Sequence, residues 1–232
     1  MINKRHRKGL PLKVREFYAK YLPVGDRLGE TFYAVWMVVI SLGILGATGL
    51  EEKSIAYVIF VAFAVNMTWG VIDGISVMQS KVIERAKTDQ TVYDLRTRND
   101  QSAREAASAS LNGSVAASLG EGDMRKVIDL IAAGKPGDDP SKKPYFAKKE
   151  DWFYAIGIFF IDTLIVVPIV APLLVFDDPV KALYTSQLIA TVFFAALGVA
   201  YAKNLHRRKW LAALWLGTLC FSLFTFAYFW GW

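Results

Sequence analysis

The sequence predicts an all-α integral membrane protein with five transmembrane helices and a helical cytoplasmic insert between spans 2 and 3. Of its 232 residues 54% are hydrophobic and yet 21% are charged, so the charge must be segregated along the chain. Uncharged apolar runs of about 20 residues recur, and each is long enough to cross a bilayer core of about 30 Å. Only two of the 27 Lys and Arg residues, Lys53 and Lys181, fall in short turns between such runs, which places the other basic residues on the cytoplasmic side.

The chain divides into four parts by composition. We expect a basic cytoplasmic or interfacial arm at 1–28, transmembrane helices 1 and 2 within 29–85, the cytoplasmic insert at 86–151, and transmembrane helices 3 to 5 within 152–232. This arrangement puts the N-terminus inside and the C-terminus outside the membrane, and lipid is then the first partner of the chain.

The arm combines basic residues from Lys4 to Lys20 with aromatic residues such as Phe17 and Tyr21. This combination is typical of a topology signal with a helix lying at the headgroup level. Binding of anionic lipid headgroups by the same segment is a compatible alternative.

The five expected spans are uncharged or nearly so. They cover 31–50, 55–79, 152–176, 183–202 and 210–232. In the third span, Pro168 and Pro172 should free backbone carbonyls and kink the helix. Aromatic residues at the end of the fifth span, Tyr228, Phe229, Trp230 and Trp232, predict an aromatic belt at one membrane interface.

The sequence predicts a mostly helical insert. The stretch 88–119 has helical residues with few strong breakers, although Asn112-Gly113 interrupts it. A second, shorter helix is expected over 124–133 with Asp123 as its N-cap. That shorter helix has apolar residues at i, i+3, i+4 and i+7, so it should bury one face. The residues are Met124, Val127, Ile128 and Ile131.

An amide and a carboxyl group lie inside the apolar second span. Asn66 and Asp73 are seven residues apart, which is two helical turns, so they share a helix face with Gly70 between them. Asp162 lies near the middle of the third span and would meet Asp73 if these helices pack together. Each aspartate either hydrogen-bonds a neighbouring helix or lines an ion or proton path, and acids inside a span are usually functional.

Other residues of the second span support narrower hypotheses. Met67 and Met78 are possible soft metal ligands beside Asp73, although methionine in a helix more often fills gaps in packing. Gly70 and Gly74 form a pair of small residues one turn apart, which favours close approach of another helix.

Several classes of function lack support. The single cysteine, Cys220, excludes a disulfide within the chain, and both histidines lie among basic residues, where metal ligation is disfavoured. No catalytic set of side chains emerges, so we expect no enzyme and no permanently bound cofactor. Topology accounts for the basic charge, so we expect no nucleic-acid partner.

This plan resembles the vacuolar iron transporter family over the whole length of the chain. Locally, the stretch 74–78 and its charged exit 81–85 look like the end of the family's second span, and Pro168 and Pro172 suit its third span. The resemblance implies five spans, a cytoplasmic N-terminus and a helical metal-binding insert. The family also carries an acid in its first span, whereas the run 31–50 has none.

Two functions follow as hypotheses. The first is a homodimeric transporter of a divalent metal such as iron or manganese. It would lie in a cell or inner membrane, and its transport could be coupled to protons. Its transport path would contain Asp73, Asn66 and Asp162, and the metal itself would be substrate. The alternative is a non-transporting membrane scaffold or assembly subunit.

Overall fold

The computed structural model describes residues 12–47 and 54–230, and every regular element within these ranges is a helix. The chain forms two compact units. One comprises Met1–Ser76 with Trp152–Trp232, and the other comprises Val77–Asp151. Predictions that rest on the basic residues before position 12, on the turn at 51–53 or on Trp232 lie outside the described residues.

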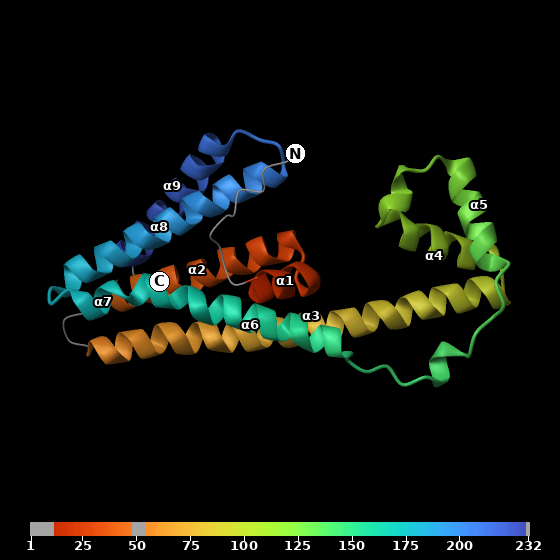
Figure 1. Ribbon diagram of the computed structural model, residues 1–232, viewed down its shortest axis with the longest axis horizontal. Coiled ribbons are helices and arrows are strands. Elements are labelled where there is room, and N and C mark those ends of the chain that lie inside the picture. The colour runs from red at the N-terminus through yellow and green to blue at the C-terminus, as the bar shows by residue number, and fades with distance from the viewer. Residues whose placement is uncertain (1–11, 48–53, 231–232) are drawn as a thin grey trace. The chain divides into compact units, whose positions relative to one another are not determined.

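Among the described residues, five helices are long and apolar enough to cross a membrane, as predicted (Figure 1). Their insertion and orientation remain predictions. The helices are α2 (Val24–Ala47), α3 (Ile55–Thr97), α6 (Lys149–Val170) with its continuation α7 (Pro172–Val175), α8 (Pro179–Asn204) and α9 (Lys209–Trp230).

The start of α2 differs from the predicted one, whereas the break near the two prolines agrees. Helix α2 begins at Val24, seven residues before the expected span, because the charged segment after Pro23 continues the helix despite Gly25 and Gly29. Before it, α1 (Leu12–Tyr21) forms a separate short helix. Helix α6 ends at Val170 and α7 begins at Pro172, so the predicted interruption near the two prolines is present.

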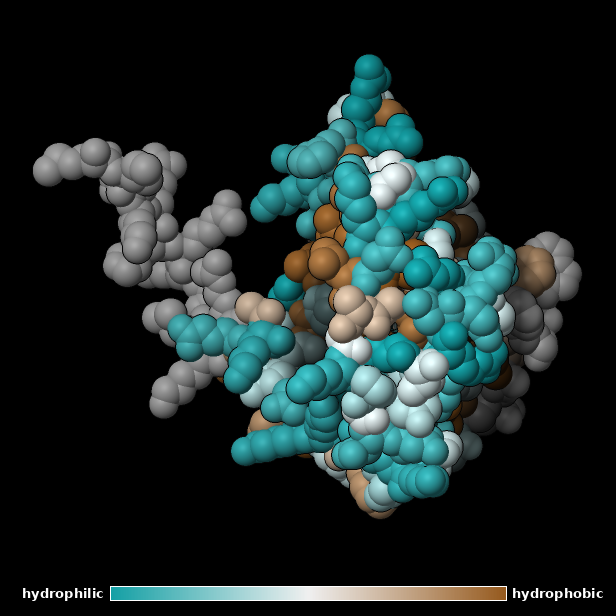
Figure 2. Space-filling model, turned by 90° about the vertical axis from the view of Figure 1, so that its right-hand side faces the viewer, coloured by the Kyte–Doolittle hydropathy of each residue, from teal (hydrophilic) through white to brown (hydrophobic). Residues whose placement is uncertain are grey.

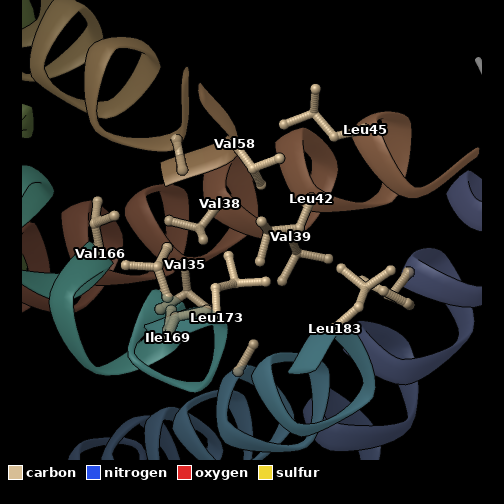
Figure 3. Packing of buried hydrophobic residues seen from close by; sticks show 14 of the residues in the cluster. Val35, Val38, Val39, Leu42, Leu45, Val58, Val166, Ile169, Leu173 and Leu183 are labelled. Atoms are coloured by element: carbon tan, nitrogen blue, oxygen red, sulfur yellow. The ribbon is translucent and has the colours of Figure 1, made fainter. Parts of the chain in front are cut away.

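A single apolar core joins the spans of the first unit. Helix α2 contributes Val35, Val38, Val39 and Leu42, which lie on one helix face and are all buried (Figure 3). They meet buried residues of α3, α6, α7, α8 and α9, and Cys220 is fully buried in the same core. This buried face is therefore the one through which α2 packs against α8 and α9.

Helices α8 and α9 approach each other very closely. A Cβ on Gly198 would overlap the carbonyl group of Ala212, so no larger residue fits at this point. Near the other end of the pair, the Gln187 side-chain amide donates to the Phe221 carbonyl at 3.3 Å. A small residue and an interhelical hydrogen bond are the usual means of holding helices together in lipid.

The second unit contains the end of α3 and four shorter helical segments. These are α4 (Gln101–Asn112), the 3₁₀ turns η2 (Val115–Ser118) and η3 (Pro140–Lys142), and α5 (Glu121–Ala132). Its buried residues form a separate small core of Leu95, Ala103, Ala107, Met124 and Ile128. Figure 2 faces the side on which α4 and α5 lie, and hydrophilic residues cover most of that face.

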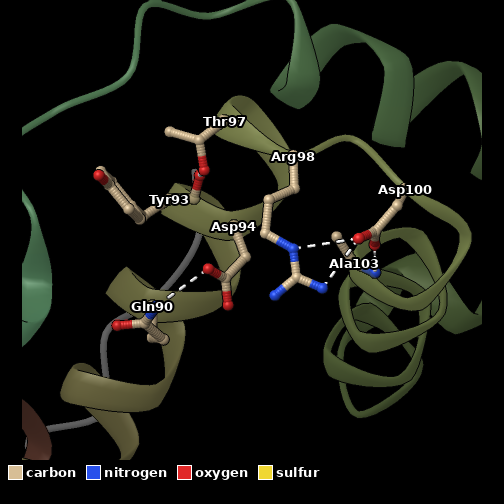
Figure 4. Close-up of polar contacts among 7 residues, drawn as sticks. All are labelled: Gln90, Tyr93, Asp94, Thr97, Arg98, Asp100 and Ala103. Atoms are coloured by element: carbon tan, nitrogen blue, oxygen red, sulfur yellow. Dashed lines mark hydrogen bonds and ion pairs between the residues drawn. The ribbon is translucent and has the colours of Figure 1, made fainter.

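The predicted interruption of the helical stretch 88–119 at Asn112-Gly113 is present, because α4 ends at Asn112. A second, earlier break was not predicted, since α3 already ends at Thr97. Asn99 adopts a left-handed conformation, with φ of 48°, and the chain turns into α4 (Figure 4). Asp100 caps α4 by accepting from the Ala103 amide at 2.8 Å, and it pairs with Arg98 at 2.8 Å. The amide hydrogen bond, followed by that from Arg98, lowers the pKa of Asp100.

The short helix of the insert also begins earlier than predicted. Gly120 is the N-cap of α5, so Asp123 lies in its first turn and pairs with Lys126 at 2.8 Å. The predicted capping role of Asp123 is therefore wrong. The expected buried face is present, since Met124 and Ile128 belong to the small core.

Candidate metal centre

The polar face of α3 lies against α6. A Cβ on Gly70 would be 3.1 Å from Asp162 Cβ and Oδ2 and from Phe159 Cα, while one on Gly74 would be 3.0 Å from the Ala155 carbonyl oxygen. The two glycines thus permit the close helix approach that their spacing predicted. Asp162, in the middle of α6, therefore lies beside Gly70 of α3, which is between Asn66 and Asp73 in the sequence.

Three carboxylates meet at this contact. One ligand oxygen each from Glu30 of α2, Asp73 of α3 and Asp162 of α6 lies within 4.8 Å of the other two. The structure therefore brings together the two aspartates that the sequence singled out, and it adds a glutamate. We call Glu30, Asp73 and Asp162 the carboxylate cluster.

Asp162 is the most buried member of the cluster. Its side chain is only 2% exposed, and neither carboxylate oxygen has a hydrogen-bond partner. Within the described ranges no hydrogen bond or ion pair reaches Glu30 or Asp73 either. A buried carboxylate without partners is costly, so the cluster lacks a compensating group.

Another buried carboxylate of the same chain shows what full compensation looks like. Asp151, 4% exposed, accepts from both terminal nitrogens of Arg85 at 3.0 and 2.7 Å. It also accepts from the backbone amide of Lys148 at 2.7 Å. Asp162 has none of these donors, so its burial serves something other than an internal ion pair.

Asn66 has an unpartnered oxygen as well. Its side-chain nitrogen donates to the Ala62 carbonyl at 3.1 Å, while Oδ1 is buried without a donor and the residue is 1% exposed. Asn66 precedes Gly70 by one helical turn on the face that meets α6. It therefore supplies a neutral oxygen on the same helix face as the contact with Asp162.

Electrostatics favours a cation at the cluster. Two like charges about 4 Å apart repel by about 4 kcal/mol at an effective dielectric constant of about 20, and the cluster contains three such pairs. Protons or a metal ion would remove this repulsion. Three carboxylate oxygens form the type of ligand set that hard or borderline divalent ions prefer.

Glu30 was missed because it was assigned to the charged flank before the first span. The structure extends α2 back to Val24, so Glu30 lies almost two turns inside this helix. The first membrane-spanning candidate thus contains an acid, contrary to the expectation from the run 31–50. No residue between Asp26 and Thr31 signals this extension in the sequence, since Gly29 there disfavours a continuous helix.

Of the two predicted methionine ligands, the structure does not bring Met67 into the carboxylate cluster. Met67 is 42% exposed, on a different side of α3 from the buried Asn66 and Gly70. Its role as a metal ligand has no support in this geometry. Met78 belongs to the other compact unit, and its role stays a prediction.

In comparisons with known proteins, no family model matches the chain, and neither a curated protein nor a solved structure matches it. The resemblance to vacuolar iron transporters therefore remains an expectation from the sequence.

Proposed function

We propose that this protein is a membrane transporter of divalent cations, with Glu30, Asp73 and Asp162 as ligands in the transport path. The observation that carries the proposal is the burial of Asp162, whose two oxygens lack partners beside two further carboxylates. A site that needs positive charge and lies among apolar helices is suited to bind a cation within the membrane.

The ligand set favours one class of substrate. Carboxylate oxygens, with the Asn66 amide oxygen close along α3, favour manganese, iron(II) and similar ions over soft ions such as copper(I). Exchange of the cation for protons is part of the proposal, because the same carboxylates need compensation when the cation leaves. Assembly as a homodimer remains a prediction from the sequence.

Flux through reconstituted protein tests the proposal. Proteoliposomes containing the full chain should take up Mn²⁺, and Glu30→Gln, Asp73→Asn and Asp162→Asn should each reduce the initial rate by at least about tenfold. This reduction corresponds to about 1.4 kcal/mol. A pH-sensitive dye inside the vesicles should report proton movement opposite to Mn²⁺.

Asp177→Asn is the matched control. Asp177 is an exposed carboxylate in the turn between α7 and α8, so its neutralisation should leave the flux unchanged. Equal flux in wild type and the three cluster variants would refute transport through this site. Absence of flux in every protein would favour the non-transporting membrane subunit instead.

A further inference from the structure

A buried hydrogen bond joins α2 and α6 outside the carboxylate cluster. The Tyr154 hydroxyl donates to Oδ2 of Asp26 at 2.6 Å, and Tyr154 is only 3% exposed. A buried phenol normally finds a partner, and a carboxylate acceptor gives a short, charge-assisted bond. Asp26 is itself partly buried, so the pair is shielded from solvent.

The pair lies on the same two helices as two members of the cluster. Asp26 precedes Glu30 by one turn of α2, and Tyr154 precedes Asp162 by two steps of four residues on α6. At 1.5 Å per residue, these offsets are about 6 Å along α2 and about 12 Å along α6. A cation that moved from the cluster toward the starts of these helices would therefore meet Asp26 next.

Apolar side chains cover the neighbouring surface of α6. Leu22, at the junction of α1 and α2, is fully buried, and a Cβ on Gly157 would overlap its Cδ1. Phe17 and Tyr21 of α1 pack against Phe153, with ring centroids 5.9 and 5.0 Å away. These contacts form an apolar surface of α6 beside the pair of Asp26 and Tyr154.

We propose that a divalent cation reaches the cluster through Asp26, the access carboxylate. In the closed state the Tyr154 hydroxyl occupies this carboxylate until a cation displaces the hydroxyl. The inference rests on the proposed cation site. In the closed state, Asp26 accepts a hydrogen bond from the Tyr154 hydroxyl. When the cation arrives, it coordinates the Asp26 oxygens, and Tyr154 turns away with its proton still bound.

This role predicts a kinetic effect without an equilibrium effect. Removal of the hydroxyl frees Asp26, so a cation should enter and leave faster by the same factor. A hydrogen bond to a charged group is strong enough for a change on the order of tenfold in both rates. The affinity of the cluster should not change, because the hydroxyl belongs to the closed access position alone.

The test uses Mn²⁺ and the full chain in detergent. Equilibrium binding is followed by the loss of the electron paramagnetic resonance signal of free Mn²⁺, and dissociation by rapid mixing with a chelator. Tyr154→Phe should raise the association and dissociation rates about tenfold at constant Kd. Asp26→Asn keeps an acceptor for Tyr154 but removes the access charge, so it should slow both rates.

Tyr201→Phe, which removes the hydroxyl of a partly buried tyrosine on α8, is the matched control and should change neither rate. Rates within twofold of wild type in both Tyr154→Phe and Asp26→Asn would overturn the access role, even with Mn²⁺ bound normally. A changed Kd in Tyr154→Phe, produced by a change in only one of the two rates, would overturn it too, because Tyr154 would then shape the cluster itself. Absence of Mn²⁺ binding by the wild type would instead refute the proposed cation site, and the access role with it.

Discussion

Gly70 lies directly against Asp162, with no room for a side chain between the two backbones. A Cβ at position 70 would be 3.1 Å from both the Cβ and the Oδ2 of Asp162. Glycine at this position thus lets α6 bring its buried carboxylate to α3, where Asp73 completes the contact. The position of the carboxylate cluster depends on a missing side chain as much as on the acids themselves.

Gly70→Ala should therefore weaken Mn²⁺ binding by about tenfold, or about 1.4 kcal/mol. The new methyl group would push the Asp162 carboxylate by a few tenths of an ångström away from Glu30 and Asp73. Equilibrium binding of Mn²⁺ to purified protein measures this loss.

Gly74→Ala is the control for this effect, because its Cβ would be 3.0–3.3 Å from Ala155 and from no carboxylate. Both variants should lose similar stability, but Gly74→Ala should keep most of the affinity for Mn²⁺. A similar loss of affinity in the two variants would mean that helix packing in general, and not the position of Asp162, sets the affinity.

Neutralisation of Asp162 should separate stability from binding. Without metal, Asp162→Asn should stabilise the protein by about 1–2 kcal/mol, because a neutral asparagine needs neither a proton nor a cation to offset a buried charge without partners. Wild type should gain about 2.7 kcal/mol at an Mn²⁺ concentration of about 100 times the Kd, and the variant should gain much less. Thermal unfolding in detergent with and without Mn²⁺ measures both quantities, with the exposed Asp177→Asn as control. A variant less stable than wild type without metal would contradict the view that Asp162 is uncompensated.

The closest contact between α8 and α9 gives a prediction that is independent of function. Gly198→Ala should destabilise the protein by about 1–3 kcal/mol, since its methyl group would overlap the backbone of Ala212. Gly217→Ala on the facing helix should be tolerated, because its Cβ would make ordinary contacts at 3.6–3.9 Å. Thermal unfolding of the two variants compares them, and equal effects would show that the α8–α9 contact is looser than described.

The stability of the first turn of α4 should depend on pH. Hydrogen bonds from Ala103 and Arg98 lower the pKa of Asp100 below the ordinary aspartate value of about 4. The stabilisation is therefore fully present above about pH 4 and is lost as the pH falls through the lowered pKa of the folded state. Hydrogen exchange of the Ala103 amide should accelerate, relative to unprotected amides, as the pH falls through this range. In Asp100→Asn, which caps without titrating, the protection should not change with pH; an equal pH response in both proteins would refute the role of Asp100.

Much of the architecture follows from the sequence, because long uncharged runs and segregated basic residues leave few alternatives. The shared face of Asn66, Gly70 and Asp73 follows from helical periodicity alone. Helix ends are less predictable. Val24 and Thr97 lie in polar sequence, where a helix continues or stops according to local capping and tertiary contacts.

The candidate site was only half predictable for the same reason. Asp73 and Asp162 stand out as acids inside apolar runs, but Glu30 precedes its run and looks like an ordinary flank. Its place in the cluster depends on how far α2 extends and on which face it turns to α3 and α6, and both depend on packing between distant segments. The pairing of Asp26 with Tyr154, 128 residues apart, was equally beyond reach.

The fully buried Cys220 has a practical consequence. It is the only thiol in the chain, and it lies in the apolar core, where a water-soluble reagent does not reach it. A cysteine introduced at an exposed position would therefore be labelled against almost no background. Placed in the α7–α8 turn at Asp177 or in α4 at Ser110, it would report, in intact vesicles, on which side of the bilayer each segment lies.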